Sequence, residues 1–353
     1  EPLYREALAI DRRLWGDDHP EVATGLVNLG RLQMSRGDLA AAEALVREAL
    51  ELRRRLHGGH RPHVAECLSP LGAVQRRRGD WAGAEASFRE VLDMKRRLHG
   101  DGTAPVADAI NDLAVLIDEK QGPGAGLALQ REALAIHRRT LAPDDPTIAI
   151  DLVNLAFSLT TLREFDEARA LYEEGLTLLV ASLGEQHPKV LLNHNNLARL
   201  YQSTGDLDAA EAMFRRVLAG RRLALGEKHD QVAVTMGDVA SVLRERGRYD
   251  DAERMLAEAL TLFDETLGAE HPATLVTHVN HGRVLCDLGR FTAAEPELRT
   301  VHGGRAAIYG PAHPRTLIAN ATLARAVVAH SDAREAEELF TSIFDAPAGA
   351  IPE

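Results

Sequence analysis

The stretch that decides the fold runs from Leu183 to Gly226 and reads LGEQHPKVLLNHNNLARLYQSTGDLDAAEAMFRRVLAGRRLALG. Its landmarks return whenever the sequence is shifted by 42 residues, with no insertion or deletion across seven intervals. The glycine after the leucine falls at Gly16, Gly58, Gly100, Gly184, Gly226, Gly268 and Gly310, and Ala142 takes the remaining place. A fixed period of this length indicates a protein built from stacked repeats.

Each repeat is predicted to hold two helices. After Pro188 the apolar residues recur mostly at spacings of three and four, as an amphipathic helix requires: Val190, Leu191, Leu197, Leu200 and Tyr201. His187 stands where an N-cap belongs, because proline is favoured at the first helical position. Gly205 permits a left-handed helix end, and Asp206 can cap the second helix. Since neither helix can bury its apolar face alone, neighbouring repeats must stack.

The second helix carries Leu207, Met213, Phe214, Val217 and Leu218 at helical spacing. Within it, the column of Ala210 is small in almost every repeat: Ala42, Ala84, Gly126, Ala168, Ala252, Ala294 and Ala336. A small side chain lets two helices approach closely where they cross. We therefore expect this column to be buried at the crossing of each helix pair.

The period also predicts where elements begin. First helices are expected to start near Glu21, His63, Pro105, Thr147, Lys189, Gln231, Ala273 and Arg315, and second helices near Leu39, Trp81, Gly124, Phe165, Leu207, Tyr249, Phe291 and Ala333. Residues 1–15 match the second helix of a truncated repeat, residues 16–344 form eight repeats in a single solenoid, and residues 345–353 form a flexible tail. Because the chain begins without Met and inside a helix, we expect it to be a piece of a longer protein.

Three repeats depart from the pattern. The third replaces its turn with the glycine-rich run 121–126, which should weaken the start of its second helix. The second repeat places Pro70 inside its first helix, where a kink is expected. In the seventh, Gly303 and Gly304 lie late in the second helix and predict a local soft spot.

Composition narrows the function classes. A net charge of −12 argues against general binding to nucleic-acid phosphates. No apolar run approaches the ~18 residues of a membrane span, so we expect no membrane partner. The two cysteines, Cys67 and Cys286, lie five repeats apart and cannot pair within one array. We expect both to be reduced, which fits the cytoplasm.

We find no motif for catalysis: no Gly-x-Ser-x-Gly, no His-Glu-x-x-His and no Cys-x-x-Cys. The histidines His19, His187, His229, His271 and His313 share the link column, where a structural role in the turn is expected. His278 and His281 could offer two metal ligands, with Cys286 beyond, but the sequence places no third ligand. We therefore predict no enzyme, no cofactor and no metal site.

The pattern His187-Pro188, Asn196-Leu197-Ala198, Gly205-Asp206-Leu207 and Ala210-Glu211 resembles the 42-residue class of tetratricopeptide repeats, best known from kinesin light chains. The resemblance covers essentially the whole chain. It implies an all-α, right-handed superhelical solenoid of antiparallel helix pairs whose first helices line the concave face. It implies little about function, because one fold hosts many functions.

The resemblance also proposes where a ligand would lie. Inward columns contain Asn28, Asn154, Asn196 and Asn280, and one turn later Arg31, Phe157, Arg199 and Arg283. Asn195 and Gln202 are expected on the same turns as Asn196 and Arg199. Asparagine can bond both an amide N–H and a carbonyl of an extended peptide, and arginine offers forked donors to acidic side chains. In the alternative interpretation, the asparagines tether neighbouring helices instead.

Tetratricopeptide domains that hold a C-terminal carboxylate pair this asparagine with a lysine one turn earlier. That column here reads Thr24, Glu66, Asp108, Ile150, Leu192, Val234, Val276 and Ile318, so a clamp of that kind is not expected. We predict a scaffold for protein–protein interaction that binds a peptide or partner segment on its concave face. The partner is either a separate protein or another domain of the same polypeptide. The alternative is a regulatory or sensor domain that controls a kinase, NTPase or protease domain outside this chain.

Overall fold

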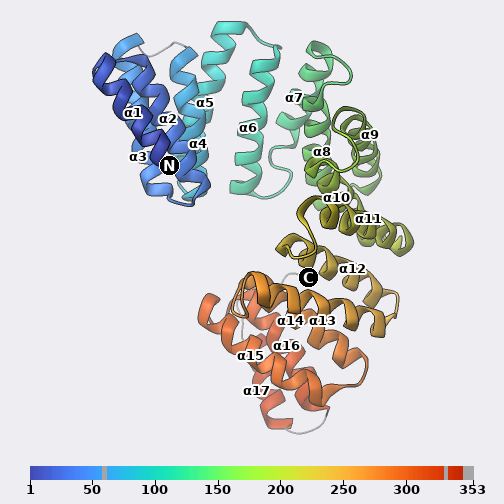
Figure 1. The fold of residues 1–353 in the computed structure, drawn as a ribbon. Helices are drawn as coiled ribbons and strands as arrows, with labels where there is room; N and C mark the ends of the chain where they lie inside the picture. The colour runs from blue at the N-terminus through green and yellow to red at the C-terminus, as the bar shows by residue number, and fades with distance from the viewer. Residues whose placement is uncertain (58–61, 330–332, 345–353) are drawn as a thin grey trace. The chain divides into compact units, whose positions relative to one another are not determined.

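A computed structural model of the chain consists of helices joined by short links (Figure 1). The structure describes residues 1–57, 62–329 and 333–344, and in these ranges every regular element is an α-helix. Two expectations, the link glycine Gly58 and the tail 345–353, lie outside the described residues. In chain order the helices are α1 (Pro2–Trp15), α2 (Pro20–Ser35), α3 (Leu39–His57), α4 (Pro62–Arg77), α5 (Trp81–His99), α6 (Ala104–Gln121), α7 (Leu127–Thr140), α8 (Pro146–Thr161), α9 (Phe165–Leu183), α10 (Pro188–Thr204), α11 (Leu207–Leu225), α12 (Asp230–Glu245), α13 (Tyr249–Thr266), α14 (Pro272–Asp287), α15 (Phe291–Tyr309), α16 (Pro314–Val328) and α17 (Ala333–Phe344).

The described helices begin almost where the period predicts. Every first helix starts one residue earlier than predicted, because the residue at the proline position already belongs to its first turn. Second helices start at the predicted residue except in the third repeat, where α7 begins at Leu127 rather than near Gly124. Gly122 and Gly124 there have φ of 106° and 88°, in the left-handed region that a right-handed helix excludes. Neither Pro70 in α4 nor the Gly303–Gly304 pair in α15 interrupts its helix.

The histidine of the link column caps the first helices, as predicted for His187. The His187 Nδ1 atom accepts a hydrogen bond of 3.2 Å from the backbone N–H of Lys189. The same bond recurs at His19, His229, His271 and His313. The predicted turn of the fifth repeat is also confirmed, since Gly205 has φ 84° and the Asp206 carboxylate accepts from the N–H of Ala209 at 3.1 Å.

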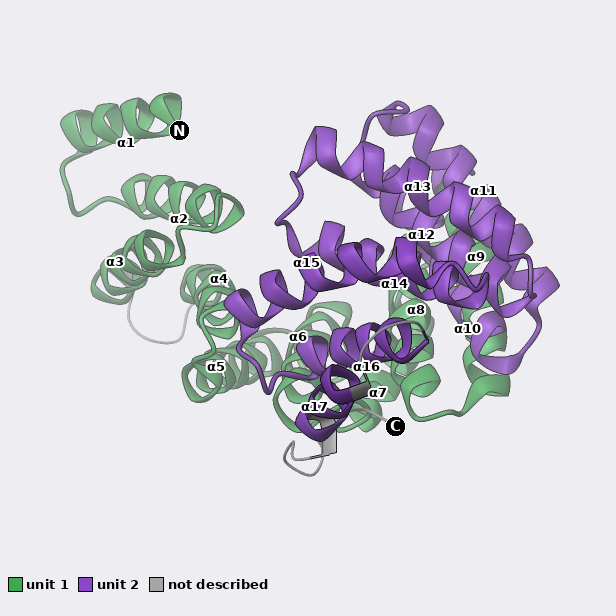
Figure 2. Cartoon of the chain, turned by 90° about the horizontal axis from the view of Figure 1, so that it is seen from below, with its two compact units in different colours: residues 1–182 green, residues 183–353 purple. Residues whose placement is uncertain are grey.

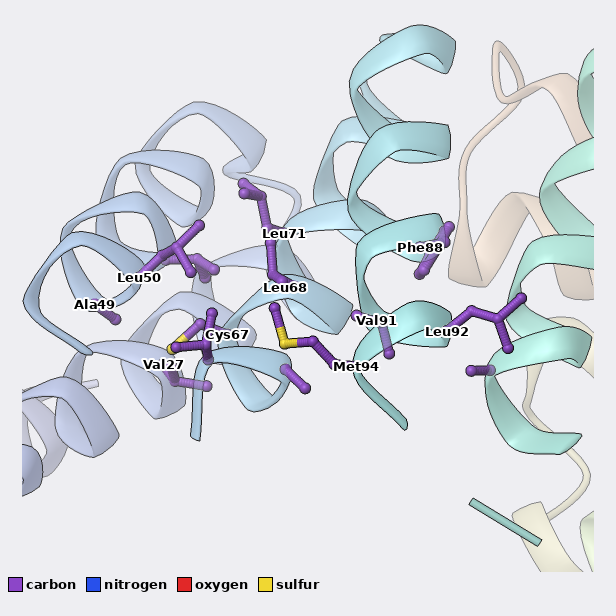
Figure 3. Packing of buried hydrophobic residues seen from close by; sticks show 14 of the residues in the cluster. Val27, Ala49, Leu50, Cys67, Leu68, Leu71, Phe88, Val91, Leu92 and Met94 are labelled. Carbon is purple, nitrogen blue, oxygen red and sulfur yellow. The ribbon is translucent and has the colours of Figure 1, made fainter. Parts of the chain in front are cut away.

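The chain divides into two compact units, residues 1–182 and residues 183–353 (Figure 2). We describe each unit by itself. Within each, consecutive helices pack as antiparallel pairs, and each pair packs on the next. In the first unit one cluster of buried residues extends from Leu8 to Ile136, so the core continues from repeat to repeat. Figure 3 shows part of this cluster, where Cys67 and Leu68 of α4 lie between the side chains of α3 and α5.

The small column is buried as predicted. Ala42, Ala84, Ala168, Ala210, Ala252 and Ala294 have no exposed surface. Where Gly126 occupies the column, an added Cβ would lie 2.4 Å from the carbonyl oxygen of Ala114 on α6. The two helices of the third repeat therefore approach too closely even for alanine. Of the helices that the structure describes, none is long and apolar enough to cross a membrane.

Candidate functional site

The first helices of consecutive repeats lie next to one another in each unit. Their side chains are joined by polar contacts such as Asn111 to Asp151 at 2.5 Å between α6 and α8, and Arg244 to Asp287 at 2.5 Å between α12 and α14. We call the surface formed by α2, α4, α6 and α8, or by α10, α12, α14 and α16, the first-helix face of its unit. All ten predicted ligand-binding residues belong to these helices.

The asparagine column of this face has side chains without intramolecular partners. Asn28, Asn154, Asn196 and Asn280 are all half-buried. Within the described ranges, none of their side-chain amides forms a hydrogen bond to another residue. A half-buried amide normally finds a partner in the protein or in water. In the described structure, therefore, no hydrogen bond supports the alternative interpretation that these asparagines tether neighbouring helices.

The predicted arginine and glutamine side chains near this column differ in their hydrogen-bond partners. Arg199 of α10 binds the carboxylate of Asp238 at 3.0 Å, and Gln202 donates to Ser241 at 3.0 Å. Among the described residues, Arg283 bonds only to the hydroxyl of Thr322, at 3.4 Å, and the Arg31 side chain is exposed. Asn195 is 7% exposed and its buried Oδ1 has no partner among the described residues. Arg199 and Gln202 thus already contact the next repeat.

A cavity of about 460 Å³, here called cavity A, opens on the first-helix face of the first unit. It lies between α6, α7 and α8. The predicted residues Asn154 and Phe157 belong to its wall, and the Phe157 ring is 59% exposed. The whole lining consists of Val115, Asp118, Glu119, Gly122, Pro123, Gln130, Asn154, Phe157 and Ser158.

Asp118 organises the polar part of cavity A. Its carboxylate accepts hydrogen bonds from the backbone N–H of Gly126 at 2.7 Å, from Gln130 Nε2 at 2.8 Å and from the Ser158 hydroxyl at 3.2 Å. The bond to Asp118 fixes the orientation of the Gln130 amide, because Nε2 donates to the carboxylate while Oε1 is left as a free acceptor among the described residues. Gln130 is 4% exposed, and its Oε1 has no partner in the described structure. Cavity A therefore offers a buried acceptor beside an exposed aromatic ring.

Two other cavities lie on first-helix faces. Cavity B, about 590 Å³ in the first unit, includes Arg31 and shares Val115 with cavity A. Cavity C, about 420 Å³ in the second unit, includes Asn280 and Arg283. Five of the predicted residues therefore line one of the three cavities: Arg31, Asn154, Phe157, Asn280 and Arg283. The other five line none of these three: Asn28, Asn195, Asn196, Arg199 and Gln202.

Sequence reasoning missed Asp118 and Gln130 in cavity A, and Arg305 and Arg315 in cavity C. The glycine-rich run 121–126 is the signal for cavity A in the sequence, although its composition alone predicts only a weak start of the second helix. Gly122 and Pro123 from this run form part of the cavity wall. The irregular turn thus shapes a binding surface as well as shortening α7.

Several solved structures are similar to this chain. BtubC (BKLC) from P. vanneervenii is 27% identical, with a TM-score of 0.59, over 66% of this chain and 94% of that one. A putative kinesin light chain from Podosopora anserina is 22% identical, with a TM-score of 0.52, over 57% and 95%. A Signal Transduction ATPase with Numerous Domains from Pyrococcus horikoshii, with a tetratricopeptide repeat sensor, is 13% identical, with a TM-score of 0.67. The match covers 92% of this chain and 47% of the ATPase, so this chain spans about half the length of that protein.

No curated protein matches the sequence significantly. Family models do match, and two of them are described as tetratricopeptide repeat. One matches residues 1–53, 22–97, 147–223, 191–265, 231–302 and 274–346, and the other matches residues 106–147. Together they span both units and agree with the 42-residue period and the paired helices. The chain therefore belongs to the tetratricopeptide repeat family.

Proposed function

We propose that this protein is an interaction scaffold that holds an extended peptide segment of a partner along the first-helix face of its first unit. Cavity A is the centre of the proposed site, and Asn154 and Phe157 are its main contacts. The remaining predicted residues, from Asn28 and Arg31 to Asn280 and Arg283, stay predictions for other parts of the same surfaces. We propose binding rather than catalysis as the activity.

The observation that carries this proposal is the asparagine column. An extended peptide presents alternating N–H and C=O groups, and one asparagine side chain can bond to both kinds. The amides of Asn28 and Asn154 make no hydrogen bond to other described residues and are held on helices. They are consequently available to a ligand backbone without breaking any contact of the fold.

Cavity A adds a preference for the segment's side chains. Most of its exposed lining is apolar, and the Phe157 ring stands open to solvent beside it. An apolar side chain that enters would cover this ring and remove both from water. The orphan Gln130 Oε1 would accept an N–H or O–H from the same ligand residue. We therefore propose that the segment inserts a large apolar residue with a polar hydrogen, such as tryptophan or tyrosine.

Photo-cross-linking from cavity A in the native host tests this function. A benzoylphenylalanine at position 157 should link one partner segment, and that link should be lost when Asn154 is also changed to Ala. The matched control places the same probe at Leu98, an exposed apolar residue of α5 in the same unit. If both positions capture the same proteins, or if position 157 captures none, the proposed site is wrong.

A second candidate is a regulatory or sensor domain acting on an enzyme in the same polypeptide. It is favoured by the similarity to the tetratricopeptide repeat sensor of the Pyrococcus horikoshii ATPase, where the matched part is about half of a longer chain. Reading the gene on both sides of this segment tests it. A kinase, NTPase or protease domain there, with an activity that changes when the repeats are removed, would favour regulation in cis.

We also propose a cytoplasmic location. Cys67 and Cys286 are both buried and neither forms a disulfide. Unpaired thiols are typical of reducing compartments. Secretion of the native protein into the medium would contradict this location.

A further inference from the structure

Three arginines converge on cavity C, which lies between α14, α15 and α16 of the second unit. They are Arg283 of α14, Arg305 of α15 and Arg315 of α16, and the amide of Asn280 lies beside them. Arg305 is only 4% exposed. Burying a guanidinium is costly unless an anion or several hydrogen bonds compensate. The partners of these three groups therefore decide what the cavity can bind.

Within the described residues these arginines bond only to neutral groups. Arg305 donates to the carbonyl oxygens of Arg315 at 2.6 Å and Leu275 at 3.5 Å. Arg283 donates to the Thr322 hydroxyl at 3.4 Å, and Arg315 to the Tyr309 hydroxyl at 3.0 Å. None of the three forms an ion pair in the described ranges.

The electrostatics agree with this lack of partners. Burial lowers the pKa of Arg305, the Tyr309 side chain raises it, and the positive charges of Arg283 and Arg315 lower it further. Burial also lowers the pKa of Arg283, as does Arg244, while Asp287 opposes both. Asp287 itself is bound by Arg244 at 2.5 Å and Arg325 at 2.7 Å. Its negative charge is therefore shared with two other guanidinium groups.

The same column of an earlier repeat shows what is missing. Arg53 lies six repeats before Arg305 and is buried in the same way. Like Arg305, it donates to a backbone carbonyl ten residues later, that of His63, at 2.6 Å. Arg53 also binds the carboxylate of Glu66, which lies thirteen residues after Arg53 in the sequence. Thirteen residues after Arg305 the chain has Ile318, so this carboxylate is absent from the eighth repeat.

A second column shows the same loss. Arg199 lies two repeats before Arg283, and its carboxylate partner Asp238 follows after 39 residues. At the equivalent distance from Arg283 the chain has Thr322. Two of the three arginines of cavity C, Arg305 and Arg283, therefore lack the carboxylate that an equivalent arginine, Arg53 or Arg199, binds.

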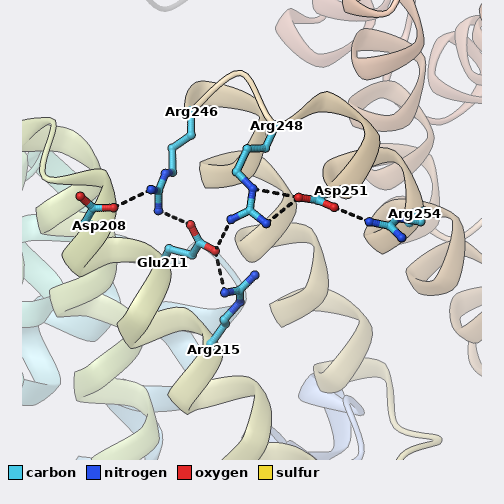
Figure 4. A network of polar contacts seen from close by, with 7 residues as sticks. All are labelled: Asp208, Glu211, Arg215, Arg246, Arg248, Asp251 and Arg254. Carbon is cyan, nitrogen blue, oxygen red and sulfur yellow. Dashed lines mark hydrogen bonds and ion pairs between the residues drawn. The ribbon is translucent and has the colours of Figure 1, made fainter.

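Elsewhere in the second unit, three guanidiniums do share one carboxylate. Figure 4 shows Glu211 of α11 bound by Arg215, Arg246 and Arg248 together. One carboxylate can therefore satisfy three arginines in this fold. Cavity C also holds three guanidinium groups, those of Arg283, Arg305 and Arg315, but no carboxylate lies among its lining residues.

We propose that cavity C binds a carboxylate from outside the chain, the side chain of an aspartate or glutamate in a partner segment. The ligand supplies the negative charge that Glu66 and Asp238 provide to Arg53 and Arg199. Val276, Val279 and Ile318 line the same cavity and favour an apolar residue next to the acidic one. This inference rests on the proposed function in one respect, that the ligand is a peptide segment. Its site, cavity C, lies in the second unit, whereas cavity A lies in the first.

Titration of the whole chain with a defined peptide tests the proposal. The probe is Ac-Ala-Val-Glu-Val-Ala-NH₂, followed through the side-chain Nε–Hε signals of the arginines at low ionic strength. We expect saturable shifts of the Arg283 and Arg305 signals, and affinity at least about tenfold weaker for the peptide with glutamine in place of glutamate. Equal binding of the two peptides overturns the proposal, as does absence of shifts. Stronger binding of inorganic phosphate than of the glutamate peptide overturns the assignment to a carboxylate.

A substitution can supply the missing acid from within. Ile318→Glu places a carboxylate where Glu66 lies relative to Arg53, so it should abolish peptide binding and raise the unfolding midpoint above that of the neutral control Ile318→Gln. Ile318→Gln adds no charge, so it should bind the glutamate peptide at least about tenfold more tightly than Ile318→Glu does. If Ile318→Glu does not fold, Thr322→Asp supplies the acid to Arg283 and should likewise block the peptide. Undiminished binding in a folded acid variant contradicts the proposal. Because cavity A is untouched, its cross-linking result is unaffected by either outcome.

Discussion

Arg199 of α10 donates a 3.0 Å hydrogen bond to the Asp238 carboxylate of α12, and this ion pair joins the first helices of two consecutive repeats. Burial raises the pKa of Asp238, while the charges of Arg199 and Arg221 lower it, and burial has the larger effect. The hydrogen bond from Arg199 therefore stabilises the Asp238 carboxylate, which burial separates from water. An arginine column that was predicted to face a ligand also serves to hold the repeats together.

Removing the arginine of this pair should destabilise the second unit. Arg199→Ala leaves the Asp238 carboxylate buried without its hydrogen-bond donor, which should cost about 1–3 kcal/mol. The control is Arg169→Ala, whose partner Asp166 is 3.7 Å away and fully exposed, with an expected change within about 0.5 kcal/mol. Urea denaturation of both variants measures the free energies of unfolding. Equal values would mean that the Arg199–Asp238 contact contributes nothing to stability.

Overpacking the small column should disrupt one helix pair. Ala210 has no exposed surface, so Ala210→Arg forces α10 and α11 apart and buries an unpaired charge. We expect a loss of at least about 1–3 kcal/mol, with faster hydrogen exchange centred on α10 to α13. Ala212→Arg is the control, because Ala212 is exposed on the same helix. Unchanged exchange in Ala210→Arg would show that the column tolerates large side chains.

Two glycines, Gly126 at the N-cap of α7 and Gly237 inside α12, should respond oppositely to substitution by alanine. Gly126→Ala brings a Cβ to 2.4 Å from the Ala114 carbonyl and should destabilise the third repeat. Gly237→Ala meets no atom within 4 Å and should stabilise α12 by about 0.5–1 kcal/mol. Thermal unfolding of the two variants compares these effects. A stabilising Gly126→Ala would refute the close approach of α6 and α7.

The acid-side stability of the second unit should depend on Glu297. Burial raises the pKa of Glu297, but the hydrogen bonds and the charges of His278 and His281 together outweigh burial and hold this pKa below its ordinary value of 4.5. The contribution of Glu297 is therefore complete above pH 4.5 and is lost as the pH falls through the folded-state pKa.

Urea denaturation from about pH 3 to about pH 6 can measure this dependence. The stability difference between wild type and Glu297→Gln should be largest at the upper end and shrink on acidification. The exposed Glu258→Gln is the control and should show a small difference at every pH. A Glu297 difference that grows as the pH falls would contradict the direction of its pKa shift.

The helices were predictable because their signals are local and repeated. Prolines such as Pro188 and Pro272 stand at the first residue of a helix, and the apolar columns recur with each repeat. One repeat with clear signals therefore indicates where the helices of the others begin. The start of α7 was not predicted, because it depends on positive φ at Gly122 and Gly124 and on the close approach of Gly126 to α6. These are effects of backbone geometry that apolar periodicity does not record.

The site was only partly predictable for a different reason. The asparagine column follows from the period, but whether an arginine is paired depends on a residue one repeat away. Asp238 lies opposite Arg199, whereas Thr322 lies opposite Arg283. Comparing columns in pairs, rather than one at a time, would have revealed this difference. The orphan Gln130 oxygen could not be inferred, because it results from the hydrogen bond between Gln130 and Asp118 in the folded chain.

Calorimetric titration of the partner segment cross-linked at position 157 tests the central claim most directly. The segment should bind the wild-type chain with one-to-one stoichiometry. Phe157→Ala and Asn154→Ala should each weaken it about tenfold to a hundredfold, with helicity and melting unchanged, and Leu98→Ala should bind like wild type. If both cavity A variants bind the segment with wild-type affinity, the first-helix face around Asn154 and Phe157 is not the binding site.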